Sequence, residues 1–341
     1  MEHALTLARV LADPQTSATL DCEGWTALIA VARAEQLAGT LAYRVEGLPM
    51  PDAARAILAD ARASAEHGRR AALWEAEMAR RALAPLGCPV VLLKGTAFVA
   101  GGLLAGRGRS IGDLDILVPR DALDAVEAAL LAHGWEWVKP DAYDDAYYRR
   151  WMHELPPLIH RERDRMIDVH HTILPPTARP TPDTAALIAE SVALGNGLRM
   201  LSPTDMIVHA AAHLFADGDL AGGLRNLWDI HCLAEEFGTE NLVARATHHG
   251  LRRETMRAMR QANTLFGTDV PGASLVRNSV DPLYRRRLLA RDGWGRPTRS
   301  LTRLGFYVRS HWLRMPPLLL ARHLWTKWRG QRRSSVGTRS S

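Results

Sequence analysis

Two aspartates placed two positions apart carry the clearest chemical signal in the sequence. Asp113 and Asp115 lie in the run GDLDILV, which otherwise predicts a strand, and the two-residue period of a strand places both side chains on one face. Carboxylates this close repel each other, so a folded chain tolerates them best with a cation between them. Hard oxygen ligands of this kind suit Mg²⁺ or Mn²⁺, together with phosphate oxygens and water. The pair therefore predicts a divalent cation bound with a nucleotide.

A second group, Lys94-Gly95-Thr96, follows directly on a predicted strand and precedes a predicted helix. A glycine at this place lets backbone amides approach a phosphate, and the start of a helix adds partial positive charge. Lys94 is unusual because the chain contains three lysines and 40 arginines. An ammonium directed at a phosphate or at the two carboxylates is one reason to keep a lysine here, and an ordinary surface lysine is the other interpretation.

Two histidines and an arginine–aspartate pair follow later in the chain. His209 and His213 are one helical turn apart, which is zinc-ligand spacing, but no glutamate follows His209 as a zinc protease motif requires. Hydrogen-bonded structural histidines are therefore the favoured interpretation, with a zinc site as the alternative. Arg225 and Asp229 have the spacing of a helical ion pair, worth about 0.2–0.5 kcal/mol on an exposed helix.

Three short apolar runs predict the strands that position these residues. They are the segments CPVVLLKG, LDILV and MIDVHH, at residues 88–95, 114–118 and 166–171. Between the first two, AFVAGGLLAG predicts a helix, and RDALDAVEAALLAHG predicts another that begins near Asp121 and ends at Gly134. Strands that alternate with helices in this way predict a sheet with helical cover.

The chain divides into four predicted regions. Residues 1–86 predict helices, because apolar residues recur at intervals of three and four, and residues 87–174 hold the predicted strands. A proline-rich linker at 175–183 leads to a second helical region, 183–284, and a basic tail, 285–341, ends the chain. The predicted fold class is α+β: a small α/β core with a mixed sheet, flanked by N-terminal and C-terminal helical segments.

The order of these residues resembles the signature of the nucleotidyltransferase superfamily that includes polymerase beta and the small antibiotic-modifying adenylyltransferases. That signature is a strand, Gly-Ser, a helix, a strand with Asp-x-Asp, and a third acid on a later strand. The matching residues here are Gly95 and Thr96, then Asp113 and Asp115, and finally Asp168, with Arg109 as the basic residue before the acid pair. Thr96 replaces the commoner serine and keeps its hydroxyl.

Residues 85–235 look most like a branch of uncharacterised bacterial nucleotidyltransferases. That branch tends to show Asp-x-His on a later strand, then His-x-x-x-His and Leu-Arg-x-x-x-Asp. The matching residues are Asp168 and His170, His209 and His213, and Leu224, Arg225 and Asp229. The resemblance implies supporting roles around the site for His170, His213, Arg225 and Asp229. His170 is favoured over His171 because it shares a strand face with Asp168.

The resemblance also implies an activity, with Mg²⁺ or Mn²⁺ as cofactor. A nucleoside monophosphate would pass from a nucleoside triphosphate, such as ATP, to an unidentified acceptor with release of pyrophosphate. Asp113 and Asp115 would hold the metal that carries the triphosphate, and with Asp168 they would share a second ion. Asp168 is also the candidate base for the acceptor hydroxyl. The predicted nucleotide-binding residues are Lys94, Gly95, Thr96 and Arg109.

Positive charge is concentrated at the C-terminal end. The 341-residue chain has a formal net charge of +6, but residues 285–341 contain 15 lysines and arginines against a single acid, Asp292. Tryptophans and tyrosine alternate with these arginines. Such a segment favours an anionic partner, either nucleic acid or an anionic membrane surface, and a merely solubilising terminus is the alternative.

Several other classes of protein receive no support. No apolar run approaches the roughly 18 residues of a membrane-spanning helix, and the first residues lack the pattern of a signal peptide. Cys22, Cys88 and Cys232 form no CxxC, so we expect a reduced, cytoplasmic protein, peripheral at a membrane if the tail binds lipid. GxxxxGK[ST] is missing from the sequence, which disfavours a P-loop enzyme. The competing hypothesis is a catalytically silent nucleotide-sensing or adaptor protein that docks through its tail.

Overall fold

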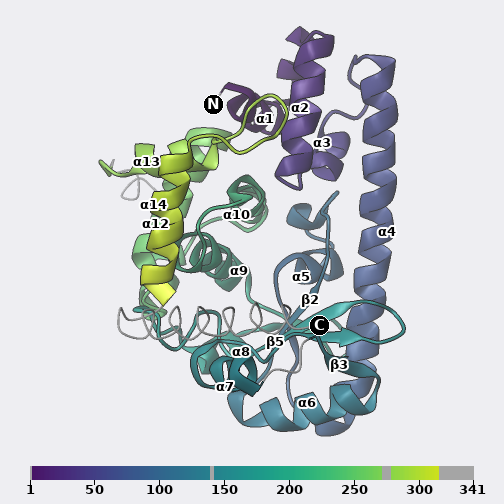
Figure 1. Cartoon of the computed structure of the whole chain (residues 1–341), viewed down its shortest axis with the longest axis vertical. Coiled ribbons are helices and arrows are strands. Elements are labelled where there is room, and N and C mark those ends of the chain that lie inside the picture. The colour runs from purple at the N-terminus through teal and green to yellow at the C-terminus, as the bar shows by residue number, and fades with distance from the viewer. Residues whose placement is uncertain (1, 139–141, 271–277, 315–341) are drawn as a thin grey trace, which may run out of the picture.

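The structure is a computed structural model that describes residues 2–138, 142–270 and 278–314. Its N-terminal part is helical, as predicted. The elements are α1 (Glu2–Ala12), α2 (Cys22–Ala34), α3 (Ala38–Arg44) and the long α4 (Asp52–Leu83). Alanines such as Ala72, Ala76 and Ala79 recur on the buried face of α4, so the helix packs closely along its length. Figure 1 shows α4 running along one side of the molecule, from the other N-terminal helices to the sheet.

A mixed sheet lies at the other end of α4. Within the described ranges it has seven strands in the order β3-β4-β5-β2-β1-β7-β6. The pairs β2–β5 and β1–β7 are parallel, and the other neighbours are antiparallel. The strands are β1 (Val91–Leu92), β2 (Leu114–Leu117), β3 (Trp135–Trp137), β4 (Leu158–His160), β5 (Met166–His170), β6 (Val192–Ala193) and β7 (Arg199–Met200). The predicted mixed α+β architecture is confirmed.

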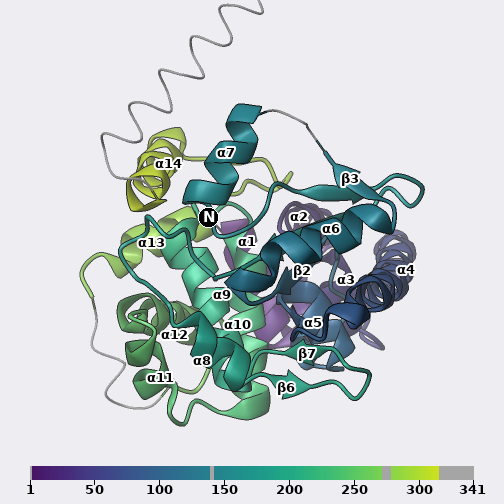
Figure 2. The ribbon, with the colours of Figure 1, turned by 90° about the horizontal axis from the view of Figure 1, so that it is seen from below.

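The three predicted strand runs contain β1, β2 and β5, which form the centre of the sheet. The prediction missed β3, β4, β6 and β7, because strands of two or three residues are too short to show a period. Figure 2 shows β3 and β6 at opposite edges of the sheet. The sheet also includes strands that follow the predicted linker at 175–183, since β7 at Arg199–Met200 pairs with β1.

Helices α5 (Lys94–Ala100), α6 (Leu123–Ala132) and α7 (Ala142–Trp151) belong to the core region. Helix α5 begins three residues before the predicted run and ends before Gly102, whose φ of 69° only glycine adopts at no steric cost. Gly134, with a φ of 96°, likewise follows the end of α6. Because α5 starts immediately after β1, Lys94 lies at the carboxyl end of that strand.

The C-terminal helices pack on the sheet and on the N-terminal helices. They are α8 (Thr184–Ala189), α9 (Pro203–Ala212), α10 (Gly223–Phe237), α11 (Leu242–His248), α12 (Arg252–Phe266), α13 (Asp281–Leu288) and α14 (Ser300–Arg314). A π-helical turn, His213–Asp217, follows α9. One apolar core joins the three parts, with Leu37, Ile116 and Leu233 fully buried. None of the helices in the described ranges combines the length and the apolar character needed to cross a bilayer.

Part of the predicted basic tail is folded against the body. Arg291 forms an ion pair with the buried Glu35 at 2.7 Å, and Phe306 on α14 is buried. Arg309 donates to the backbone oxygen of Phe215 at 2.5 Å. This part of the predicted tail therefore contacts the body through Arg291, Phe306 and Arg309, whereas the stretch 315–341 lies outside the described residues.

Candidate active site

The parallel pair β2 and β5 brings two of the predicted acids together. Asp115 and Asp168 are direct Cα partners in this pair, so their side chains leave the same face of the sheet. Asp113 immediately precedes β2 at the same end. Carboxylate oxygens of the three aspartates lie within 4.8 Å of one another. Three acids from two separate segments thus form one cluster.

Asp115 is the buried centre of this cluster. Its Oδ1 accepts from Lys94 Nζ at 2.6 Å and lies 2.9 Å from His170 Nε2. Burial would raise the pKa of Asp115, but the charge of Lys94 and the hydrogen bond from His170 together outweigh it and hold that pKa below its ordinary value. Asp115 is therefore ionised at neutral pH, and its other oxygen is the one left for a further ligand.

The pKa values of the other two acids, Asp113 and Asp168, are raised, whereas that of Asp115 is lowered. Burial, reinforced by the charges of Asp115 and Glu154, raises the pKa of Asp168 to about 7. Burial and Asp115 also raise the pKa of Asp113. The single ammonium of Lys94 is therefore insufficient to balance the negative charge gathered here. A crowded set of carboxylate oxygens with unbalanced charge fits a hard divalent cation such as Mg²⁺ or Mn²⁺.

The backbone fixes the direction of Lys94. Leu93 donates its amide to the backbone oxygen of Asp115 at 3.0 Å, so the end of β1 is held against β2. Lys94 then takes a φ of 49°, in the left-handed region that a residue with a side chain rarely adopts. Such a conformation costs on the order of 1–3 kcal/mol and is found most often at functional sites. The ammonium of Lys94 therefore contacts a carboxylate, as one of its two predicted roles requires.

Gly95 provides space in a way that the sequence did not indicate. A Cβ atom at Gly95 would lie 2.5 Å from Nε of Arg109, so the space beside this glycine is filled by the arginine and not left open for a phosphate. Thr96 is buried, and its Oγ1 lies 3.5 Å from the backbone oxygen of Asp113. Glycine at position 95 thus makes room for the Arg109 side chain and not, as predicted, for a phosphate, while a nucleotide-binding role for Gly95 and Thr96 stays a prediction.

Arg109 belongs to a chain of buried charges. It forms an ion pair with Asp229, whose Oδ1 also accepts from Arg225 at 2.9 Å. Arg225 in turn donates to Oγ1 of Thr40 at 2.8 Å. Arg225 and Asp229 are 3% and 2% exposed, so the exposed-helix energy assumed from their spacing does not apply. The chain joins the segment before β2 to α10 and α3.

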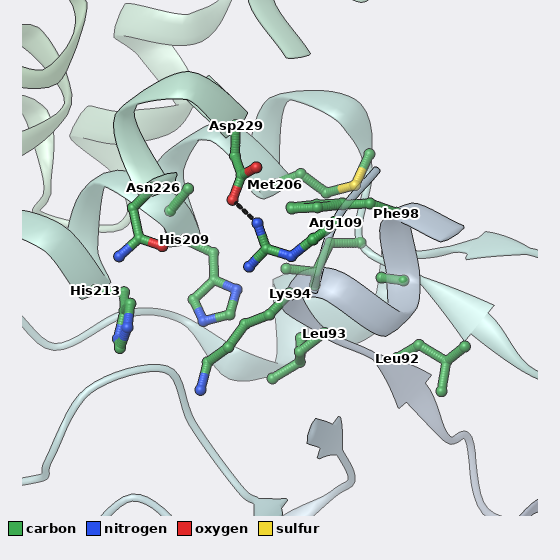
Figure 3. Close-up of a pocket in the computed structure, with 13 residues that line it drawn as sticks. Leu92, Leu93, Lys94, Phe98, Arg109, Met206, His209, His213, Asn226 and Asp229 are labelled. Carbon is green, nitrogen blue, oxygen red and sulfur yellow. Dashed lines mark hydrogen bonds and ion pairs between the residues drawn. The ribbon is translucent and has the colours of Figure 1, made fainter. Parts of the chain in front are cut away.

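A small hollow, with about 20 Å³ of free space, lies next to Lys94 and is shown in Figure 3. Lys94, Arg109, His209 and Asp229 form its polar side, and leucines with Phe98 and Met206 form its apolar side. Burial, followed by the charge of Lys94, lowers the pKa of His209 well below its ordinary value, so the imidazole is neutral. The hollow is thus lined by two cations that are already paired, Lys94 with Asp115 and Arg109 with Asp229, and by a neutral imidazole.

Within the described residues, His209 and His213 belong to no group of three or more donors that could share a metal ion. Among the described residues, groups of three donors near enough to share an ion are Asp113 with Asp115 and Asp168, and His153 with Glu154 and His170. The structure thus favours the interpretation of His209 and His213 as ordinary polar residues that line the hollow. Sequence reasoning missed His153 and Glu154, because no spacing connects them to His170.

Fold and site together define a class. A mixed sheet with helical cover carries three convergent aspartates next to an ammonium at the start of a helix. Such an acidic group could hold a metal ion. The chain belongs to a family of uncharacterised nucleotidyltransferases, which matches residues 21–267. No curated protein matches it.

Proposed function

We propose that this protein transfers a nucleoside monophosphate from a nucleoside triphosphate to an acceptor hydroxyl, with Mg²⁺ or Mn²⁺ as cofactor. The observation that carries the proposal is the pairing of Asp115 with Asp168 across β2 and β5, with Asp113 beside them. Membership of the nucleotidyltransferase family supports the reaction class. A place for that family in the polymerase-beta-like superfamily is part of the proposal.

The residues divide the work of the reaction. Asp113 and Asp115 would hold the ion that binds the triphosphate, and Asp168 would complete the site for a second ion. When bound, such ions neutralise phosphate charge and stabilise the attacking and leaving oxygens. Lys94 stands at the mouth of the hollow, where its charge attracts the triphosphate, and Arg109 adds a second cation. Gly95 and Thr96 follow Lys94 in the first turn of α5.

Asp168 is the proposed proton acceptor. The acceptor oxygen bonds to the α-phosphorus, the bond from that phosphorus to the β-phosphate oxygen breaks, and pyrophosphate leaves. The proton of the acceptor hydroxyl passes to Asp168.

The direct test is labelling. Purified protein is incubated with each α-labelled nucleoside triphosphate, Mg²⁺ and cell extract, and we expect a labelled product together with pyrophosphate. Asp113→Asn and Asp115→Asn should each abolish the product, whereas Asp124→Asn, an exposed aspartate on α6, should not. Equal labelling by all four proteins would reject the assignment.

A second candidate function is a silent nucleotide-binding adaptor that docks on an anionic surface. The observation in its favour is an exposed apolar stripe on α14, which we call the α14 stripe: Leu301, Leu304, Val308 and Trp312 are 84%, 57%, 58% and 52% exposed. Arg299 and Arg303 are close to it in sequence. An apolar helix face beside cations suits the surface of an anionic membrane. Calorimetry that finds nucleotide binding without pyrophosphate release would favour this function.

A further inference from the structure

Three side chains next to the aspartate cluster have no part in the proposed reaction. Glu154 Oε2 lies 3.5 Å from Nδ1 of His170 and 3.8 Å from Nε2 of His153. The rings of His153 and His170 are 5.2 Å apart between their centroids. Two imidazoles and a carboxylate therefore meet around one point.

The backbone holds these side chains in register. Residues 153–155 run antiparallel to the end of β5, where Leu155 donates to Val169 and His171 donates to His153, both at 2.9 Å. Glu154 and His170 are direct partners in this short bridge. Directly opposed residues in an antiparallel pair place their side chains on one face. The contact between Glu154 and His170 is thus built into the sheet.

Some ring nitrogens of His153 and His170 have no hydrogen-bond partner among the described residues. The Nε2 atom of His170 is used by Asp115 at 2.9 Å. The Nδ1 atoms of His170 and His153 are buried and have no hydrogen-bond partner among the described residues. The side chain of His170 is 2% exposed. Buried polar atoms are nearly always satisfied, so the unpartnered Nδ1 of His170, which lies 3.5 Å from Oε2 of Glu154, indicates a missing ligand.

We propose that His153, Glu154 and His170 form a second metal site, for Zn²⁺ or a similar transition-metal ion. Two imidazoles and one carboxylate are a ligand set that zinc accepts, with a fourth position left open for water or substrate. Ligands at 2.0–2.1 Å in a tetrahedron are about 3.3 Å apart, close to the spacings found here. The all-oxygen aspartate cluster suits Mg²⁺ instead, so the two sites differ in the metal they prefer.

Asp115 orients one of the proposed ligands through a hydrogen bond to Nε2 of His170. A metal-binding histidine usually gives its other ring N–H to a carboxylate, which fixes the orientation of the ring. His170 has this relation to Asp115, and Asp115 also belongs to the aspartate cluster. The proposed zinc site therefore shares one residue with the candidate active site, while its own ligands are separate. It does not depend on the proposed nucleotidyl transfer.

The test measures metal directly in the full-length protein. Chelator-treated protein is loaded with Zn²⁺ in excess Mg²⁺, desalted and analysed for bound metal, and the Zn²⁺ affinity is determined by competition with a chelating dye. We expect one Zn²⁺ per chain. Since even residues behind metal ligands contribute 10–100-fold to affinity, His153→Gln and Glu154→Gln should each weaken binding by about tenfold or more. Matched controls are His67→Gln and Glu162→Gln, both exposed in the structure.

A second readout does not require a folded variant. X-ray absorption of the wild-type protein loaded with Zn²⁺ should show the scattering of imidazole rings at low coordination number. Asp113→Asn should leave Zn²⁺ binding in place, since Asp113 is a member of the aspartate cluster alone. Absence of bound Zn²⁺, an all-oxygen six-coordinate spectrum, or equal affinity in His153→Gln, Glu154→Gln and the wild type would each overturn the proposal.

Discussion

The ammonium of Lys94 lies 2.6 Å from Oδ1 of Asp115, at the centre of the aspartate cluster. The contact joins the residue that follows β1 to the middle of β2. Lys94 thereby balances part of the charge of the three acids when no divalent ion is bound. Its side chain also lines the adjoining hollow.

Replacing Lys94 should make stability depend on metal. In Lys94→Met the cluster loses its ammonium, and we expect the free energy of unfolding to fall by about 1–3 kcal/mol. This is less than the loss for a fully buried pair, because Lys94 is partly exposed and His170 remains. Urea unfolding with and without Mn²⁺ measures the effect. Mn²⁺ should stabilise Lys94→Met more than wild type, and an equal effect on both would contradict the charge argument.

Metal affinity should depend on the protonation of Asp168. Its pKa of about 7 in the metal-free protein means that a proton occupies the carboxylate below neutral pH and must leave when a metal binds. Affinity for Mn²⁺ should therefore rise about tenfold per pH unit up to pH 7 and then level off. Calorimetry in buffers of different ionisation enthalpy measures the released proton. In Asp168→Asn the affinity should be lower and lose most of this dependence, and an unchanged profile would sink the prediction.

Gly95→Ala should act through Arg109. The added methyl would overlap Nε of Arg109 and push the guanidinium away from Asp229, at a cost of about 1–3 kcal/mol. Thermal unfolding measures the loss. Because the two positions are in contact, Gly95→Ala should cost clearly less in an Arg109→Ala background. The matched control is Gly68→Ala on α4, where a new Cβ meets nothing within 4 Å and a gain of about 0.5–1 kcal/mol is expected. Additive losses in the double variant would contradict the mechanism.

The α14 stripe should mediate binding to anionic vesicles if the docking function is correct. Removing residues 285–341 would also remove the anchors Arg291 and Phe306, so point substitutions are the sharper test. Leu304→Glu combined with Trp312→Glu should lower vesicle cosedimentation at least about tenfold, since each buried apolar side chain is worth about 1.5–3 kcal/mol. Leu283→Glu, at an exposed position on α13, is the control. Vesicle binding that is unchanged in the Leu304→Glu, Trp312→Glu variant would contradict a membrane-docking function. Binding to RNA that persists at high salt would also contradict it.

The sequence alone determined the central strands and the acids on them. The short apolar runs that contain Leu114–Leu117 and Met166–His170 are a local pattern. Such a run can be recognised from adjacent residues alone, because it depends on their side-chain types and not on distant contacts. The convergence of Asp115 and Asp168 then needs one further step, the pairing of two strands that both carry an acid on one face.

Tertiary structure alone decided how these acids are neutralised and what surrounds them. Arg109 and Asp229 are 120 residues apart in the chain, and Asp115 and His170 are 55 apart. The bridge between Glu154 and His170 likewise joins segments with no common sequence pattern. Contacts of this kind depend on how the elements pack, and burial then sets the strength of every charge in the site. For that physical reason the sequence indicated which residues could bind a metal, and only the fold decided which cations and ring nitrogens face them.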